Sequence, residues 1–205
     1  MNIQHELATL LGEFERNNPV TIFRDREVYG QWLAQTFYYV QHSTALLGYA
    51  LPRLPADLRR HFEKHLGEES RHDLLLIKDL EKLGYKFSDF PESHITQAFY
   101  QSQYFRINFE HGTSLLGYIL YLEALATGWG KEAYDFLKNT HKGSTLFLKV
   151  HAEEDPSHVE QALGVILKLS ELEQASIIRN LRYTHEMYSL LVGSLKKQQV
   201  LLKVS

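Results

Sequence analysis

Three residues in the last third of the chain have the types and spacing of metal ligands. The segment HAEEDPSH places His151, Asp155 and His158 in an H-x3-D-x2-H pattern. An α-helix turns roughly 100° per residue, so all three side chains would share one helix face. Two imidazoles and a carboxylate suit iron, manganese or zinc. Pro156 can kink such a helix, and the alternative interpretation is a solvated polar face at a helix junction.

A second group of candidate ligands lies in the segment HLGEESRHDLLLIKDLEKLGY. Glu69 and His72 are three residues apart, which puts them on the same face of a helix. The same Glu-x-x-His arrangement projects inward in dimetal carboxylate bundles. Glu68 is a competing candidate, and His65 lies two turns before His72 on the same face. The alternative is an ordinary charged helix surface.

A third candidate ligand is Glu123, which stands in an almost wholly apolar stretch from Thr113 to Ala126. A lone buried carboxylate costs several kcal/mol unless it is paired or binds a metal. No Lys or Arg occurs between Arg106 and Lys131 to neutralise it from the same segment. We therefore predict that Glu123 is a metal ligand. A protonated core Glu and an ion pair to another helix are the alternatives.

Together these residues supply three carboxylates and three imidazoles, enough for two metal ions with open coordination positions. One ion would take Glu69 and His72, and the other would take His151 and His158. Glu123 and Asp155 would bridge the two ions or bind one of them.

The elements that must position these ligands are predicted to be helices, because apolar residues recur at three- and four-residue intervals. We predict one domain over residues 1–205 in the all-α class. Long helices joined by short connections form a bundle, which can hold a metal between inward-facing side chains. The predicted helices lie near 2–17, 24–51, 56–84, 92–128, 131–141, 143–168 and 171–202.

Composition excludes several other functions. The chain has 205 residues, a net charge of −3 and no cysteine. The charge gives no reason to expect nucleic acid or an anionic membrane surface as a partner. The lack of cysteine excludes disulfides, thiolate catalysis and Fe–S clusters. We find no signal peptide and no apolar run long enough to span a membrane. We expect a cytoplasmic protein that acts on a small molecule and forms a homodimer.

The order ExxH, a lone Glu some fifty residues later, and HxxxDxxH resembles the haem-oxygenase-like diiron oxidases and oxygenases over residues 30–165. The resemblance implies a seven-helix haem-oxygenase-like bundle, shared with the TenA and PqqC proteins. It also implies two Fe ions, with Mn in place of one as an option, and O2 as co-substrate. Such enzymes oxidise small substrates that carry an amine or a carboxylate, such as amino acids and fatty acids.

Some members of that family supply a further carboxylate from the first core helix, but here Glu27 lies near its start and its interior carries glutamines. We predict that Gln35 and Tyr38 bind substrate or a metal-bound water and act in catalysis. Arg106 is predicted to hold a substrate carboxylate, because arginine binds carboxylates through two parallel hydrogen bonds. The alternative for Arg106 is a surface ion pair.

Two other functions remain open. One is a self-sacrificing p-aminobenzoate synthase, which would consume a protein tyrosine and take its amine from Lys131, Lys142 or Lys149. The candidate tyrosines are Tyr38, Tyr39, Tyr49, Tyr104, Tyr118 and Tyr121. The other is a non-catalytic metal-binding helical protein. A TenA-type hydrolase is disfavoured, because its nucleophile is a cysteine.

Overall fold

The computed structural model describes residues 2–204, without the side chains of residues 154–156 and 196–204. The described residues form α-helices and short 3-10 and π segments and contain no β-strand, so the all-α prediction is confirmed. The α-helices are α1 (Ile3–Asn17), α2 (Arg26–Val40), α3 (Ser43–Ala50), α4 (Ala56–Glu68), α5 (Asp73–Lys82), α6 (His94–Phe109), α7 (Leu115–Leu125), α8 (Lys131–Thr140), α9 (Leu146–Ile166) and α10 (Glu171–Val204).

Three of the seven predicted helices are each divided in two. The predicted helix 24–51 consists of α2 and α3, 56–84 of α4 and α5, and 92–128 of α6 and α7. The predicted break near residue 130 is wrong, because a π-helical turn over Ala126–Gly130 joins α7 to α8. π turns inside helices are rare and occur frequently at functional sites.

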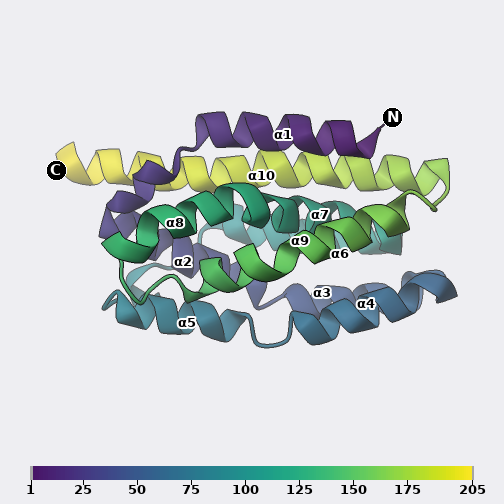
Figure 1. Ribbon diagram of the computed structural model, residues 1–205, viewed down its shortest axis with the longest axis horizontal. Coiled ribbons are helices and arrows are strands. Elements are labelled where there is room, and N and C mark those ends of the chain that lie inside the picture. Colours follow the sequence, from purple (N-terminus) through teal and green to yellow (C-terminus); the bar gives the residue numbers. More distant parts are fainter. Residues whose placement is uncertain (1, 205) are drawn as a thin grey trace.

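The helices pack with α1 and α10 side by side along one side of the molecule and α3, α4 and α5 along the opposite side (Figure 1). Between these sides, α7 contacts both α9 and α10. The α7–α10 contact depends on Gly117, where a Cβ would lie 2.8 Å from the backbone nitrogen of Leu181 and closer still to the carbonyl oxygen of Ile177. Any larger residue would force these two helices apart.

The start of α9 is held by a side chain from another helix. Asp79 on α5 is fully buried, and its carboxylate accepts hydrogen bonds from the backbone N–H groups of Leu146 (2.9 Å) and Phe147 (2.8 Å). These N–H groups belong to the first turn of α9, which has no partner for them within the helix. Burial raises the pKa of Asp79 to about 6, against the effect of the two hydrogen bonds. Asp79 thus fixes the position of the helix that carries His151 and His158.

None of the helices in the described part of the chain combines the length and the apolar character that a membrane span requires.

Candidate metal centre

Glu69 and His72 lie in the turn that separates α4 from α5, and the predicted continuous helix face is therefore wrong. Glu69 Oε2 is still 3.7 Å from His72 Nδ1, because the turn folds the two side chains toward each other. Between them, Arg71 has a φ of 75°. A left-handed conformation costs a non-glycine residue about 1–2 kcal/mol. Such strain concentrates at functional sites, where the surrounding structure maintains it.

Two groups of side chains in this region converge as metal ligands do. The first cluster consists of His65 and Glu68 of α4 and His158 of α9, whose ligand atoms lie within 4.8 Å of one another. In this cluster His158 Nε2 is 3.5 Å from Glu68 Oε2. His65 and His158 are both buried.

The second cluster consists of Glu69, His72 and His151, again with ligand atoms within 4.8 Å of one another. The rings of His72 and His151 have centroids 4.8 Å apart. His151 Nδ1 donates a hydrogen bond to the carbonyl oxygen of Phe147 at 2.9 Å. Because a carbonyl only accepts, the proton is on Nδ1, and Nε2 is left with the lone pair that binds a metal.

Glu123 of α7 lies between the two clusters. Its Oε1 is 3.3 Å from His65 Nε2 and 3.5 Å from His158 Nδ1, and the side chain is buried. His65, Glu69 and Glu123 form a further group whose ligand atoms converge within 4.8 Å. Glu123 and His65 thus connect the first cluster to the second.

Two histidines of the centre, His65 and His151, are in the form that binds metal. Burial, together with the neighbouring His158, lowers the pKa of His65 to about 4. Burial also lowers the pKa of His151 to about 4, against the effect of its bond to Phe147. Both imidazoles are therefore neutral at pH 7, and a metal does not have to displace a proton from them.

Glu68 has a competing partner. Burial raises its pKa, but the hydrogen bond from Lys64 and the charge of His158 outweigh burial, so the pKa is lowered. Lys64 Nζ is 2.8 Å from Glu68 Oε1. Glu68 is thus ionised and already partly occupied by a cation.

The structure brings together five of the six predicted ligands, Glu69, His72, Glu123, His151 and His158. The side chain of the sixth, Asp155, lies outside the described residues. The predicted division of the ligands differs from the observed one, since His72 lies with His151, and His158 lies with His65. Glu68 and Glu69, treated as competitors, both enter the centre in different clusters. His65 was not among the predicted ligands, although its spacing of seven residues from His72 signals a shared helix face.

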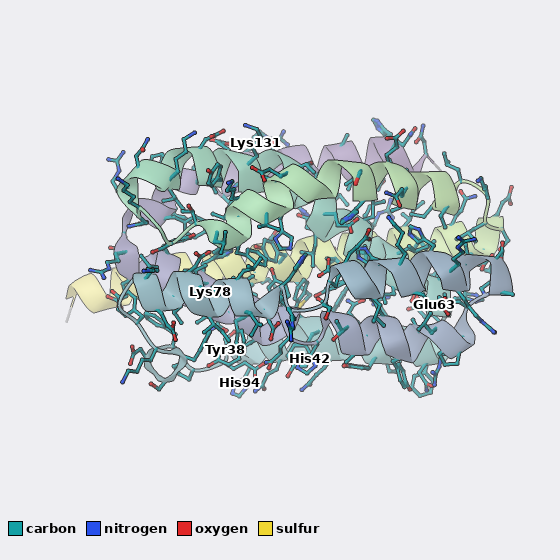
Figure 2. All side chains as sticks on the ribbon, turned by 60° about the horizontal axis from the view of Figure 1, so that its bottom comes forward. Tyr38, His42, Glu63, Lys78, His94 and Lys131 are labelled. Atoms are coloured by element: carbon teal, nitrogen blue, oxygen red, sulfur yellow. The ribbon has the colours of Figure 1, made fainter. Side chains whose placement is uncertain are left out.

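Gln35 and Tyr38 do not lie at the metal centre. The Gln35 side-chain amide donates to the carbonyl oxygen of Pro91 and accepts hydrogen bonds from Ser93 and Thr96. The Tyr38 hydroxyl donates to the carbonyl oxygen of Phe90 at 3.2 Å. In Figure 2 Tyr38 and His94 both lie along the lower edge of the molecule. These two residues fix the α5–α6 connection onto α2, and the geometry gives no support to a catalytic role.

Arg106 is also placed away from the centre. It lies on α6 rather than on the helix of Glu123, and its Nη1 is 2.8 Å from Glu110 Oε1. Its guanidinium also covers the ring of Tyr183 at 4.5 Å. The ion pair that was the alternative interpretation describes Arg106 better than substrate binding does.

A cavity of about 100 Å³ adjoins the centre, and His65, Glu69, Glu123 and His151 form part of its wall. The rest of the wall is mainly apolar and rich in aromatic rings, namely those of Trp32, Tyr39, Tyr118, Trp129, Phe147 and Tyr188. Of the six tyrosines considered from the sequence, Tyr39 and Tyr118 reach it. No lysine is among the described residues that line it.

Fold and site together define an all-α protein with a buried centre of imidazoles and carboxylates, the ligands that iron takes in proteins without haem or sulfur clusters. The sequence profile of a family described as iron-containing redox enzymes matches residues 30–189. The chain belongs to this family. A search of functionally curated proteins gives no match.

Solved structures agree on the fold. A domain of unknown function with a haem oxygenase-like fold from Shewanella denitrificans has a TM-score of 0.78 at 16% identity, over 98% of this chain and 93% of that chain. A TenA homologue from Pseudomonas syringae pv. tomato has a TM-score of 0.76 at 15% identity, over 94% and 92% of the two chains. A TenA homologue from Pyrococcus furiosus has a TM-score of 0.62 at 11% identity, over 82% and 84%. The chain thus has the haem oxygenase-like fold.

Proposed function

We propose that the protein is a non-haem diiron oxidase or oxygenase that uses O2 to oxidise a small substrate bearing an amine or a carboxylate. The observation that carries this proposal is the pair of ligand clusters joined by Glu123 and His65 beside an apolar cavity. One iron would be held by His65, Glu68 and His158, and the other by Glu69, His72 and His151. Glu123 is placed to contact both.

When bound, two ferrous ions supply the electrons with which O2 is reduced. The residues of the chain contribute the rest. The neutral imidazoles of His65 and His151 bind metal at pH 7 without releasing a proton. The apolar wall keeps bulk water away from the reacting atoms, which limits side reactions. The bond from His151 to Phe147 orients one ligand before any metal arrives.

The test is to load the purified protein with Fe(II) in the absence of O2, count the bound iron, and then follow O2 consumption with candidate amines and carboxylates. We expect about two irons per chain in the wild type. Glu123→Ala and His151→Ala should each lower that number, because each removes a ligand. Fewer than one iron per chain in the wild type would overturn the proposal, and wild-type iron content in both variants would overturn these ligand assignments.

The self-sacrificing alternative keeps one supporting observation, because three tyrosines line the cavity. Its amine donor is not supported, because Lys131, Lys142 and Lys149 are all exposed, and Lys131 is 2.8 Å from Asp135. The mass of the intact chain after reaction with O2 separates the two functions. An unchanged mass supports catalysis on an external substrate, whereas loss of tyrosine atoms supports self-sacrifice.

A further inference from the structure

The charge distribution around the cavity restricts what it can bind. The ionisable residues of its described wall, apart from tyrosines, are His65, Glu69, Glu123 and His151, all of them candidate metal ligands. The described wall contains no Lys or Arg. Burial of a charge without a partner costs several kcal/mol. A charged group on a substrate therefore has no counter-charge anywhere in the apolar part of the cavity.

Apart from the hydroxyl of the half-buried Ser43, one polar group in that apolar part of the described wall is available to a ligand. Tyr188 and Tyr39 have partners, since the Tyr188 hydroxyl accepts a hydrogen bond from Trp32 Nε1 at 3.0 Å and also pairs with Tyr39. Tyr118 differs. Its side chain is only 4% exposed, and its hydroxyl has no hydrogen-bond partner among the described residues. Buried tyrosine hydroxyls are usually paired, so a partner supplied by a ligand would stabilise this arrangement.

The Tyr118 hydroxyl keeps its proton at neutral pH. Burial and the neighbouring Glu69 carboxylate raise its pKa. It can therefore donate to a ligand acceptor as well as accept from a ligand N–H or O–H.

The size of the cavity restricts the ligand further. Its volume is about 100 Å³. For comparison, an apolar protein cavity of roughly 150 Å³ binds benzene. Because this cavity is the smaller of the two, a ligand of about the size of a single ring is the upper limit for the cavity as described, and a long acyl chain exceeds it. The aromatic side chains in the wall favour a ring, through edge-to-face and offset contacts.

We propose that this cavity is the substrate pocket, and that it binds an uncharged single-ring molecule whose one polar substituent hydrogen-bonds to Tyr118. This inference rests on the proposed function, which it narrows to substrates whose amine or other polar group is neutral at pH 7. Tyr118 then acts in specificity by distinguishing a ring with a hydrogen-bonding group from a plain hydrocarbon.

The experiment compares three ligands of similar size in the Fe(II)-loaded protein without O2, and again in the metal-free protein. Aniline is neutral and polar, benzoate is charged, and toluene has no hydrogen-bonding group. Trp32 and Trp129 are the two tryptophans of the chain, and both line the cavity, so their fluorescence reports binding there. Calorimetry gives the Kd of each ligand. In the metal-free protein we expect aniline to bind at least about tenfold more tightly than benzoate.

Two variants separate the hydroxyl from the ring of tyrosine. Tyr118→Phe should weaken aniline binding about two- to tenfold and leave toluene unchanged, because it removes one neutral hydrogen bond. Tyr121→Phe is the matched control. It removes a hydroxyl from the same helix, but Tyr121 OH is 3.0 Å from His185 Nδ1, outside the cavity wall, so all three affinities should stay as in the wild type. Ala126→Phe should fill the cavity and abolish binding of every ring.

Benzoate binding as tight as that of aniline in the metal-free protein, or equal losses of aniline and toluene in Tyr118→Phe, would overturn the inference. Counting iron in the same samples keeps the two proposals apart. Two irons per chain without selectivity for aniline contradict the pocket inference alone. Selectivity for aniline in a chain that binds less than one iron contradicts the diiron proposal alone.

Discussion

The two ligand clusters have the same chemical composition, one carboxylate and two imidazoles, but different surroundings. In the second cluster Glu69 and His72 are each 13% exposed, and His151 is oriented by its bond to Phe147. In the first cluster the Glu68 side chain is 32% exposed and already holds Lys64. Two adjacent residues, Glu68 and Glu69, thus face different conditions. We expect the second cluster to bind metal more tightly, because its ligands need less rearrangement.

The test with the largest expected effect removes the Asp79 carboxylate that holds the start of α9. Asp79→Ala leaves the backbone N–H groups of Leu146 and Phe147 without their acceptor, which should lower the free energy of unfolding by about 2–4 kcal/mol near pH 4, where the contribution of Asp79 is largest, and by less at pH 7. The melting temperature should fall by roughly 5–15 °C. His151 is closer to this end of α9 than His158 is, so iron at the second cluster should weaken more. Thermal unfolding and iron titration measure both effects, and an unchanged melting temperature would contradict the capping role.

Asp79→Asn provides a control with a defined pH dependence. The pKa of Asp79 is about 6 in the folded protein, against an ordinary value of 3.8. Between these values the folded state binds more protons than the unfolded state, so the contribution of Asp79 to stability is lost as the pH rises. Relative to Asp79→Asn, the wild type should lose up to about 3 kcal/mol between pH 4 and pH 6. Urea unfolding at several pH values measures this difference, which should level off above pH 6.

The helical class and most of the centre could be predicted from the sequence, because helix periodicity and ligand spacing are local. His151 and His158 share a helix face, and Glu123 is conspicuous as a carboxylate in an apolar segment. The turn at Glu69–His72 could not be predicted in this way, since its segment has neither proline nor glycine between the two ligands. A prediction that lacks this turn cannot assign Glu68 and Glu69 to two different clusters.

The site predictions that the geometry does not support share a physical cause. Gln35 and Tyr38 are polar residues inside a helix and are predicted to bind substrate or a metal-bound water, but both donate hydrogen bonds to backbone carbonyl groups more than fifty residues away. Arg106 has its partner one turn away, at Glu110. Hydrogen bonds to distant connections leave no pattern in one sequence. An ion pair between residues four apart does leave a pattern in the sequence, and such a pair is the alternative interpretation of Arg106.

The next test removes one histidine from each cluster. His65→Ala and His72→Ala should each reduce the bound iron to about one per chain, with the affinity of the affected position lowered at least about 100-fold. Double variants show whether the positions are separate. His65→Ala with His158→Ala should retain one iron, since both residues belong to the first cluster, whereas His65→Ala with His72→Ala should retain none.

Iron counting after gel filtration and Mössbauer spectroscopy of the single variants provide the measurements. His94→Ala is the control, because His94 is exposed and contacts Gln97 instead of the centre. Two irons in His65→Ala would remove His65 from the ligand set. Loss of both irons in every single variant would show that the two positions fill only together, and the contrast between the clusters would then be wrong.

The smallest expected effect sharpens the comparison at Glu68. Lys64→Met removes the cation that is 2.8 Å from Glu68 and keeps most of the length of the side chain. Exposed ion pairs contribute about 0.2–1 kcal/mol, so iron affinity at the first cluster should rise by no more than about fivefold. The second cluster should be unaffected, because Lys64 does not contact it.

Lys78→Met removes an exposed positive charge from α5 and is the matched control for net charge (Figure 2). A stepwise Fe(II) titration resolves the weaker binding step. An equal gain in iron affinity in Lys64→Met and Lys78→Met would mean that overall charge, rather than the Lys64–Glu68 pair, makes the first cluster the weaker one.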